Sequence, residues 1–156
     1  MIRPMKGLGR LAAAVAIIGG AALLSASPAS ARIVPCEATE FCLYVNADAN
    51  GGIYHFAGSD RDLNNDRYDV QNTDITVGNT ARNAANNGVP GPKDDVIIYA
   101  RPHWQGASDC IRQGEFGALP RSWWNNVESY QWVTDDECKA AGPPLDLGNH
   151  NIPRLR

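Results

Sequence analysis

Long apolar segments and catalytic sequence motifs are both scarce in this chain of 156 residues. The one long apolar run, residues 11–24, covers 14 residues, which is short for a membrane-spanning helix, and no second run follows it. The sequence contains no H-E-x-x-H, no G-x-S-x-G and no phosphate-binding loop motif, which disfavours the common hydrolase and nucleotide-dependent classes. The three histidines, His55, His103 and His150, are expected to be solvated or to have packing roles. We therefore expect a protein that is not an enzyme.

The first 31 residues have the features of a secretory signal peptide. Arg3, Lys6 and Arg10 form a basic start, the apolar run follows, and residues 29–31 (Ala-Ser-Ala) supply a cleavage site. Cleavage leaves residues 32–156, with 11 basic and 17 acidic side chains and a formal net charge of −6. An acidic surface lacks the basic stripe that binds nucleic acid or anionic lipid. We expect a secreted monomer of one domain with no membrane attachment after cleavage.

All four cysteines, Cys36, Cys42, Cys110 and Cys138, lie in the exported part. In an oxidising compartment two disulfides are the default, and three connectivities are possible. Structural zinc is disfavoured because the spacings C-x5-C and C-x27-C lack the close pairs that zinc sites use. Proximity in the sequence favours Cys36–Cys42 and Cys110–Cys138. On a loop-entropy estimate these bonds would contribute about 2 and about 3.5 kcal/mol.

Helix signals are almost absent after residue 31, and short β-like runs alternate with turn residues. We expect strands at residues 41–45, 53–57, 74–77, 96–100, 108–112 and 128–133. Such a pattern is typical of an all-β antiparallel sandwich. Residues 78–95 carry almost no large apolar side chain and are predicted to form an exposed linker. Residues 139–156 contain three prolines and are predicted to form a flexible C-terminal tail.

One spacing pattern occurs twice in the exported chain. Three positions recur after 55 residues: Tyr44, Ala49 and Gly51 reappear as Tyr99, Trp104 and Gly106. A second block, residues 71–76, aligns with residues 125–130 at an offset of 54. Each glycine can adopt a positive φ and let a hairpin fold back over its sheet. Trp104 would cover this fold, and Ala49 in its place predicts a looser first hairpin. We infer two copies of one unit, at about 41–77 and 96–133.

The repeated Tyr-x4-aromatic-x-Gly unit, followed by an Asn-rich block, resembles the βγ-crystallin Greek key. Cys36, then Phe41-Cys42-Leu43-Tyr44 and a glycine-containing hairpin, resemble the opening of the secreted actinobacterial peptidase inhibitors of family I36. The resemblance covers roughly residues 36–138. It implies an all-β domain at 32–138, in which two Greek-key motifs form a βγ-crystallin-like antiparallel sandwich stapled by two disulfides. It also implies inhibition of an extracellular metalloprotease.

The resemblance to family I36 further implies an inhibitory reactive bond, which maps onto Cys110–Ile111. This bond follows the cysteine of the second unit, and Cys138 would tether it. A substrate-like inhibitor needs an extended segment held rigid, so that it binds without a large ordering cost and resists cleavage. Thermolysin-like metalloproteases prefer a bulky aliphatic or aromatic residue just after the scissile bond, and Ile111 satisfies that preference. In the alternative interpretation, the Cys110–Cys138 bond only stabilises a small domain.

Calcium binding is a second possible function. In βγ-crystallin units the Asn-rich block supplies oxygen ligands to Ca²⁺, a cation that needs several such oxygens. Asn125, Asn126 and Ser129 keep most of the pattern, whereas the first copy has Gln71 and Ile75 at the corresponding positions. We expect a structural role for these turn residues, so no metal site or other cofactor is assigned, and weak Ca²⁺ binding remains an alternative.

A third possibility is a cell-wall or glycan-binding module. Exposed tryptophans can stack on sugar rings, and Trp123 and Trp124 are adjacent. In a strand, adjacent side chains point to opposite faces, so both could not face the core.

Overall fold

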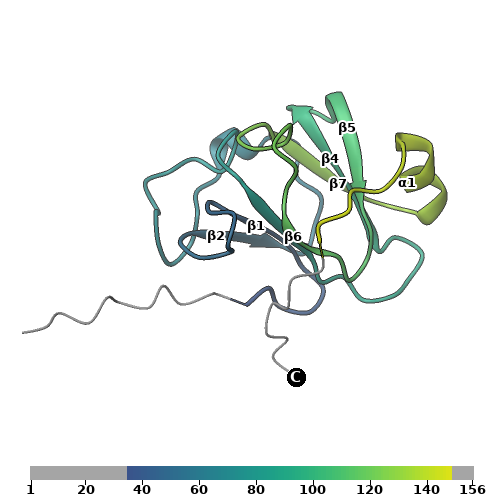
Figure 1. The fold of residues 1–156 in the computed structure, drawn as a ribbon, viewed down its shortest axis with the longest axis horizontal. Coiled ribbons are helices and arrows are strands. Elements are labelled where there is room, and N and C mark those ends of the chain that lie inside the picture. The colour runs from purple at the N-terminus through teal and green to yellow at the C-terminus, as the bar shows by residue number, and fades with distance from the viewer. Residues whose placement is uncertain (1–34, 149–156) are drawn as a thin grey trace, which may run out of the picture.

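A computed structural model describes residues 35–148 of the chain, and its fold is drawn in Figure 1. The predicted signal peptide lies outside the described residues. The elements in chain order are β1 (Phe41–Tyr44), β2 (Ile53–Phe56), the 3-10 helix η1 (Leu63–Asn65), β3 (Asn83–Asn86), β4 (Asp95–Arg101), β5 (Gln105–Ile111), β6 (Phe116–Ala118), β7 (Ser129–Val133) and α1 (Asp135–Ala141).

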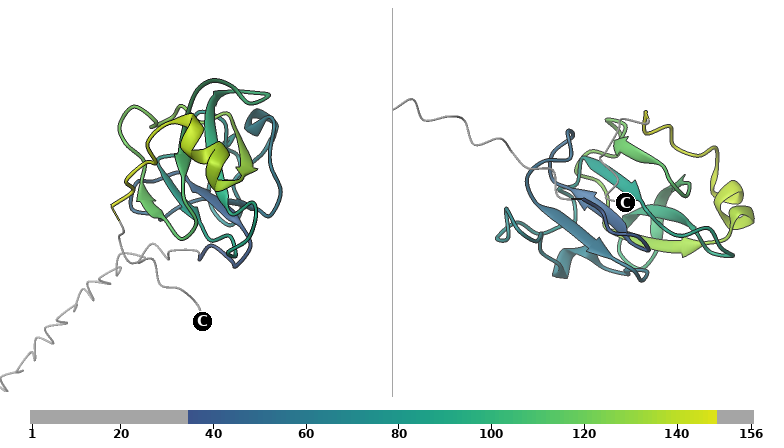
Figure 2. Two further views of the ribbon diagram at one scale, coloured as in Figure 1. Left: turned by 90° about the vertical axis from the view of Figure 1, so that its right-hand side faces the viewer. Right: turned by 90° about the horizontal axis from the view of Figure 1, so that it is seen from below.

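The strands form two antiparallel sheets of the same design, which Figure 2 shows from two further sides. The four-stranded sheet has the order β2-β1-β3-β6, and the three-stranded sheet has the order β5-β4-β7. In each sheet a hairpin, β1–β2 or β4–β5, is followed by a strand that returns to the other side of its first strand. This arrangement confirms the predicted all-β sandwich of two Greek-key motifs.

Each motif also contributes a segment to the sheet of the other. β6, from the second motif, pairs with β3 of the first. In the opposite direction, Asp60 of the first motif bridges to Tyr130 of β7 through two backbone hydrogen bonds of 3.0 and 2.9 Å. The two motifs are therefore interlocked.

The core lies between the sheets and is built from alternate residues of the central strands. Phe41 and Leu43 of β1 and Val96 and Ile98 of β4 are fully buried in it. Tyr130 joins them, with its ring centroid 4.7 Å from that of Phe41. The residues between these positions face the outer sides of the sheets, as the two-residue period of a strand requires. Smaller buried clusters that include the two disulfides cover those outer faces.

The predicted linker at residues 78–95 is wrong, because this range contains a central strand. β3 lies between β1 and β6, and all four of its residues are buried. Its small alanines fit against covered faces, and the amide nitrogens of its two buried asparagines donate to backbone carbonyl groups: Asn83 Nδ2 to Ala47 and Asn86 Nδ2 to Asp94. Hydrogen bonding thus takes the place of apolar bulk in this strand. The connection between the motifs is shorter, spanning residues 87–94.

The predicted flexible tail is also wrong where the structure describes it. Thr134 caps α1: its hydroxyl accepts from the Glu137 N–H, and the Glu137 carboxylate accepts from the Thr134 N–H. Beyond the helix, the Leu145 N–H donates to the Cys110 carbonyl oxygen at 2.8 Å, and Leu147 is buried. Residues 149–156 of the predicted tail lie outside the described residues.

Of the six predicted strands, five are present and one is not. The expected strands near residues 41, 53, 96, 108 and 128 correspond to β1, β2, β4, β5 and β7. The expected strand at 74–77 is wrong: these residues form turns and the single bridge from Thr76 to Arg67. Between residues 35 and 148, no helix has the length and apolar character that a membrane span requires.

Candidate functional site

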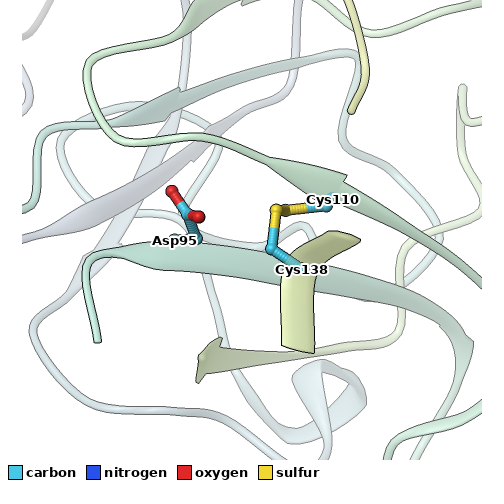
Figure 3. A group of neighbouring side chains, drawn as sticks. All are labelled: Asp95, Cys110 and Cys138. Atoms are coloured by element: carbon cyan, nitrogen blue, oxygen red, sulfur yellow. A yellow bond between two sulfur atoms is a disulfide. The ribbon is translucent and has the colours of Figure 1, made fainter. Parts of the chain in front are cut away.

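Both predicted disulfides are present. Cys36–Cys42 and Cys110–Cys138 have Cα–Cα distances of 5.8 and 5.4 Å. Asp95 lies beside the second bond, as Figure 3 shows, and its Oδ1 accepts from the Gln113 N–H at 2.9 Å. Although Asp95, Cys110 and Cys138 are close enough to hold a metal ion, their two sulfur atoms are joined to each other. Because cysteine binds metals as the thiolate, this cluster is structural.

The Cys110–Ile111 bond lies at the end of β5 with both side chains fully buried. Ile111 contributes to the core between the sheets, opposite Val96, and Cys110 belongs to the cluster beneath α1. At this end of β5, the Leu145 N–H donates to the Cys110 carbonyl oxygen. A peptidase must take up the side chain that follows the scissile bond, and Ile111 cannot reach one while β5 stays in its sheet. In this structure the Cys110–Ile111 bond is therefore not open to a peptidase, and its role as the reactive bond stays a prediction.

The strand end at Ile111 instead supports the neighbouring connection between the motifs. The Ile111 carbonyl oxygen accepts from Asn86 Nδ2 at 3.1 Å, and the same amide donates to the Asp94 carbonyl oxygen at 2.9 Å. Asn86 Oδ1 accepts from the Gly88 N–H at 3.0 Å. One buried side chain thus ties the tethered strand to both ends of residues 87–94.

The folded hairpins of the two motifs have the same backbone conformation. Ala49 and Trp104 have φ values of 58° and 61°, and Gly51 and Gly106 have values of 86° and 84°. The repeat at an offset of 55 is therefore confirmed. Ala49 is buried within the first hairpin, whereas the indole N–H of Trp104 donates to backbone carbonyl groups.

The second repeated block has a different partner from the predicted one. Residues 79–84, and not 71–76, correspond to residues 125–130, because Asn79 and Asn125 each donate a backbone hydrogen bond of 3.0 Å into the other turn. Their φ values of 61° and 56° also agree. The unequal spacing between the hairpin and this turn in the two motifs hid the correspondence from a search at a constant offset.

Ser129, a candidate calcium ligand, fastens the second folded hairpin. Its hydroxyl donates to the Arg101 carbonyl oxygen at 2.7 Å and accepts from the Trp104 N–H at 3.2 Å. Asn83, at the equivalent position of the first motif, donates from Nδ2 to the Ala47 carbonyl oxygen at 2.8 Å. The two side chains hold equivalent hairpins, which supports the structural interpretation of this position.

The other two candidate calcium ligands also have protein partners. Asn125 Oδ1 accepts from Arg82 Nε at 3.2 Å, and Asn126 Nδ2 donates to the Ser122 carbonyl oxygen at 3.4 Å. A guanidinium group next to the first oxygen repels a cation. The geometry therefore favours turn residues over a calcium site.

The two adjacent tryptophans offer little surface to a sugar. Trp123 is 4% exposed, and its indole N–H donates to the Asp109 carboxylate. Trp124 lies under two guanidinium groups, with Arg121 at 3.8 Å and Arg82 at 5.4 Å from its ring centroid. A sugar ring would have to displace these cations before it could stack.

Two interlocked Greek-key motifs around one core define a βγ-crystallin-like domain, and one solved structure supports this assignment. A structure from work on the evolution of the eye lens βγ-crystallin domain fold is similar with a TM-score of 0.50 and 13% identity, covering 66% of this chain and 94% of its own. A βγ-crystallin from an archaeon has a TM-score of 0.44 and 11% identity, covering 62% of this chain and 100% of its own. At such identities the first likeness shows the fold alone.

Sequence comparison supplies the family. The model of peptidase inhibitor family I36 matches residues 29–111, just over half of the chain. The protein therefore belongs to peptidase inhibitor family I36 and is a non-enzymatic inhibitor whose partner is a peptidase. No curated protein matches the chain in sequence. Its two disulfides are compatible with an extracellular location.

Proposed function

We propose that the protein is a secreted, monomeric inhibitor of a thermolysin-like metalloprotease, and that it blocks the active-site cleft with a rigid, substrate-like segment. The observation that carries this proposal is the family match over residues 29–111. The matched region includes the first disulfide and the whole β4–β5 hairpin up to the tethered cysteine. The signal-like residues 1–31 and the excess of acidic side chains support action outside the cell on a protein partner.

The disulfide and the exchanged segments make this domain rigid, which favours inhibition by a substrate-like segment. A segment that is already ordered loses little conformational entropy when it binds, so more of its contact energy appears as affinity. The Cys110–Cys138 bond joins β5 to α1, and the motifs exchange segments. We assign the tethered Cys110–Ile111 strand a supporting role within this mechanism, since its direct insertion would take Ile111 out of the core. Loss of a buried aliphatic side chain from a core costs about 2–5 kcal/mol.

The test is a titration of residues 32–156, with both disulfides formed, against thermolysin, using one serine and one cysteine peptidase as controls. We expect stoichiometric inhibition of the metalloprotease alone. Added Zn²⁺ should not relieve the inhibition, because the proposed mechanism blocks the cleft and does not remove the metal.

One result would contradict the metalloprotease target alone, and another would contradict the inhibitory function. Inhibition of only the serine or cysteine peptidase would keep the family function and overturn the metalloprotease target. Failure to inhibit several secreted metalloproteases at micromolar excess would overturn the proposed function itself.

A further inference from the structure

We infer that residues 89–93, in the connection between the two motifs, form the segment that contacts the peptidase cleft; this inference rests on the proposed function. The segment reads Val-Pro-Gly-Pro-Lys, and all five of its residues are exposed. Val89 is 57% exposed and is one of three large apolar side chains left open to solvent among residues 35–148. It offers the aliphatic side chain that a thermolysin-like pocket accepts, whereas Ile111 is buried in the core.

The base of this segment is closed by Asn86, which is 1% exposed. Its Oδ1 accepts from the Gly88 N–H and its Nδ2 donates to the Asp94 carbonyl oxygen, so one side chain holds the residues before and after the exposed part. The same Nδ2 also donates to Ile111 in β5. Because β5 is fixed by the Cys110–Cys138 bond, the disulfide acts on the segment through Asn86.

Gln113 also holds the start of the segment by a hydrogen bond. Its Nε2 donates to the Gly88 carbonyl oxygen at 2.7 Å, and its own N–H is held by Asp95 Oδ1. Across the segment, the Gly91 N–H donates to Asp94 Oδ2 at 2.9 Å. Hydrogen bonds therefore fix the two ends and the middle, and the side chains of residues 89–93 remain open to solvent.

The direction in which the segment leaves the domain is set by Trp132. A Cβ atom at Gly88 would lie 2.7 Å from the Trp132 ring, so the chain lies directly against the indole. The indole is itself held by a hydrogen bond of 3.1 Å from Nε1 to the Gly58 carbonyl oxygen. An open hollow of about 260 Å³ adjoins the segment and is lined by Thr39, Ala57, Gly88, Val89, Lys93 and Trp132. The rim of a peptidase cleft can enter this hollow while residues 89–93 enter the cleft.

Pro90 and Pro92 stiffen the segment between its fastened ends. Each proline fixes its own φ, and each restricts the residue before it to extended conformations. Few conformations remain to be lost on binding, which is the property that a substrate-like inhibitor needs.

The test compares two exposed valines. Val89→Asp places a charge where an apolar pocket should bind, and Val70→Asp makes the same change at a residue that is 68% exposed in another loop. We expect the inhibition constant against thermolysin to rise roughly 30-fold or more for Val89→Asp, as for a central contact residue. It should change less than about 3-fold for Val70→Asp, and cooperative thermal unfolding of each variant would show that both fold.

Asn86→Asp tests the positioning role of the buried amide, because it removes both donated hydrogen bonds with little change in size. We expect this variant to become a temporary inhibitor, and mass spectrometry should find cleavage between residues 88 and 94. A purely structural role of Asn86 would lower the melting temperature without directing cleavage to this segment.

The outcomes separate this inference from the proposed function. Wild-type inhibition that Val89→Asp leaves intact would overturn the inference alone, as would intact inhibition by uncleaved Asn86→Asp. Cleavage of the wild type between Cys110 and Ile111 by the peptidase, with Val89→Asp fully active, would restore the Cys110–Ile111 bond as the contact. A wild-type protein that inhibits no metalloprotease would overturn both proposals.

Discussion

Ser129 and Asn83 occupy equivalent positions of the two motifs and fasten their hairpins with different chemistry. The serine hydroxyl accepts from one backbone N–H and donates to one carbonyl oxygen, whereas the asparagine reaches its carbonyl with an amide. Both residues are buried, and each side chain holds the backbone of its hairpin through hydrogen bonds. At the residue scale, one residue of the pattern that suggested calcium, Ser129, therefore holds a folded hairpin together.

Ser129→Ala is expected to lower the free energy of unfolding by about 1–3 kcal/mol, because it removes two partly buried hydrogen bonds to the hairpin backbone. Urea unfolding measures the change. Ser122→Ala is the control, since Ser122 is exposed in the preceding turn.

The same samples test calcium binding. We expect millimolar Ca²⁺ to leave the melting temperature of the wild type unchanged. A rise with Ca²⁺ that disappears in Asn126→Ala would contradict the structural interpretation of the turn.

Asp66 is expected to make stability depend on pH. Burial first, and the neighbouring Asp60 carboxylate second, raise the pKa of Asp66 from 3.8 to about 6. The folded protein then binds this proton more tightly than the unfolded chain does. The stabilisation is fully present below pH 3.8 and is lost as the pH rises through about 6.

Asp66→Asn should remove this contribution. We expect the difference in melting temperature, variant minus wild type, to grow in favour of the variant between pH 4 and pH 7, reaching a few degrees. Parallel melting curves across this range, with a constant difference, would contradict the raised pKa.

At the scale of elements, the strands that alternation predicts are those with large apolar residues on one face. β1 and β4 alternate core residues such as Phe41 and Ile98 with outward ones, so their position could be read from the sequence. β3 could not, because its sequence Asn-Ala-Ala-Asn has the composition of a loop. The capping box at Thr134 and Glu137 was the available signal for α1.

Gly117 of β6 decides where the segment after α1 can lie. It has a φ of 149°, and a Cβ atom there would overlap the carbonyl oxygen of Leu147. This close approach lets residues 145–147 cover the edges of β5 and β6, where Leu145 bonds to Cys110.

Gly117→Ala is therefore expected to displace the segment and to destabilise the domain by roughly 2–4 kcal/mol, within the range for strained or overpacked sites. Faster hydrogen exchange at Leu145 and Leu147 would report the displacement. Gly91→Ala is the control, because a Cβ atom there would meet only one atom, at 3.7 Å. Equal stability of the two variants would show that the contact is not needed.

At the scale of the whole molecule, the exchange of β6 and Asp60 between motifs makes the two halves depend on each other. Without β6, the edge of β3 is unpaired, and without the second sheet, Phe41 and Leu43 lose the core that covers them. A single motif therefore has one sheet with an uncovered apolar face.

We expect a fragment of residues 32–90 to be unfolded on its own, although it contains the first disulfide and strands β1 to β3. Circular dichroism and amide chemical-shift dispersion measure this, with residues 32–156 as the folded control. Cooperative thermal unfolding of the isolated fragment would show that the motifs are independent.

The sequence by itself determined the repeated hairpin and the all-β class, favoured the two disulfides that form, and carries the match to the inhibitor family. The hairpin and the strands depend on local requirements: a positive φ near a glycine and apolar alternation on a strand. Only the tertiary structure decided that the tethered bond is buried and that residues 79–84 are the second half of the repeat. Those outcomes depend on which segments meet across the sheets, and Ile111 has an apolar side chain that suits a peptidase pocket or a protein core equally well.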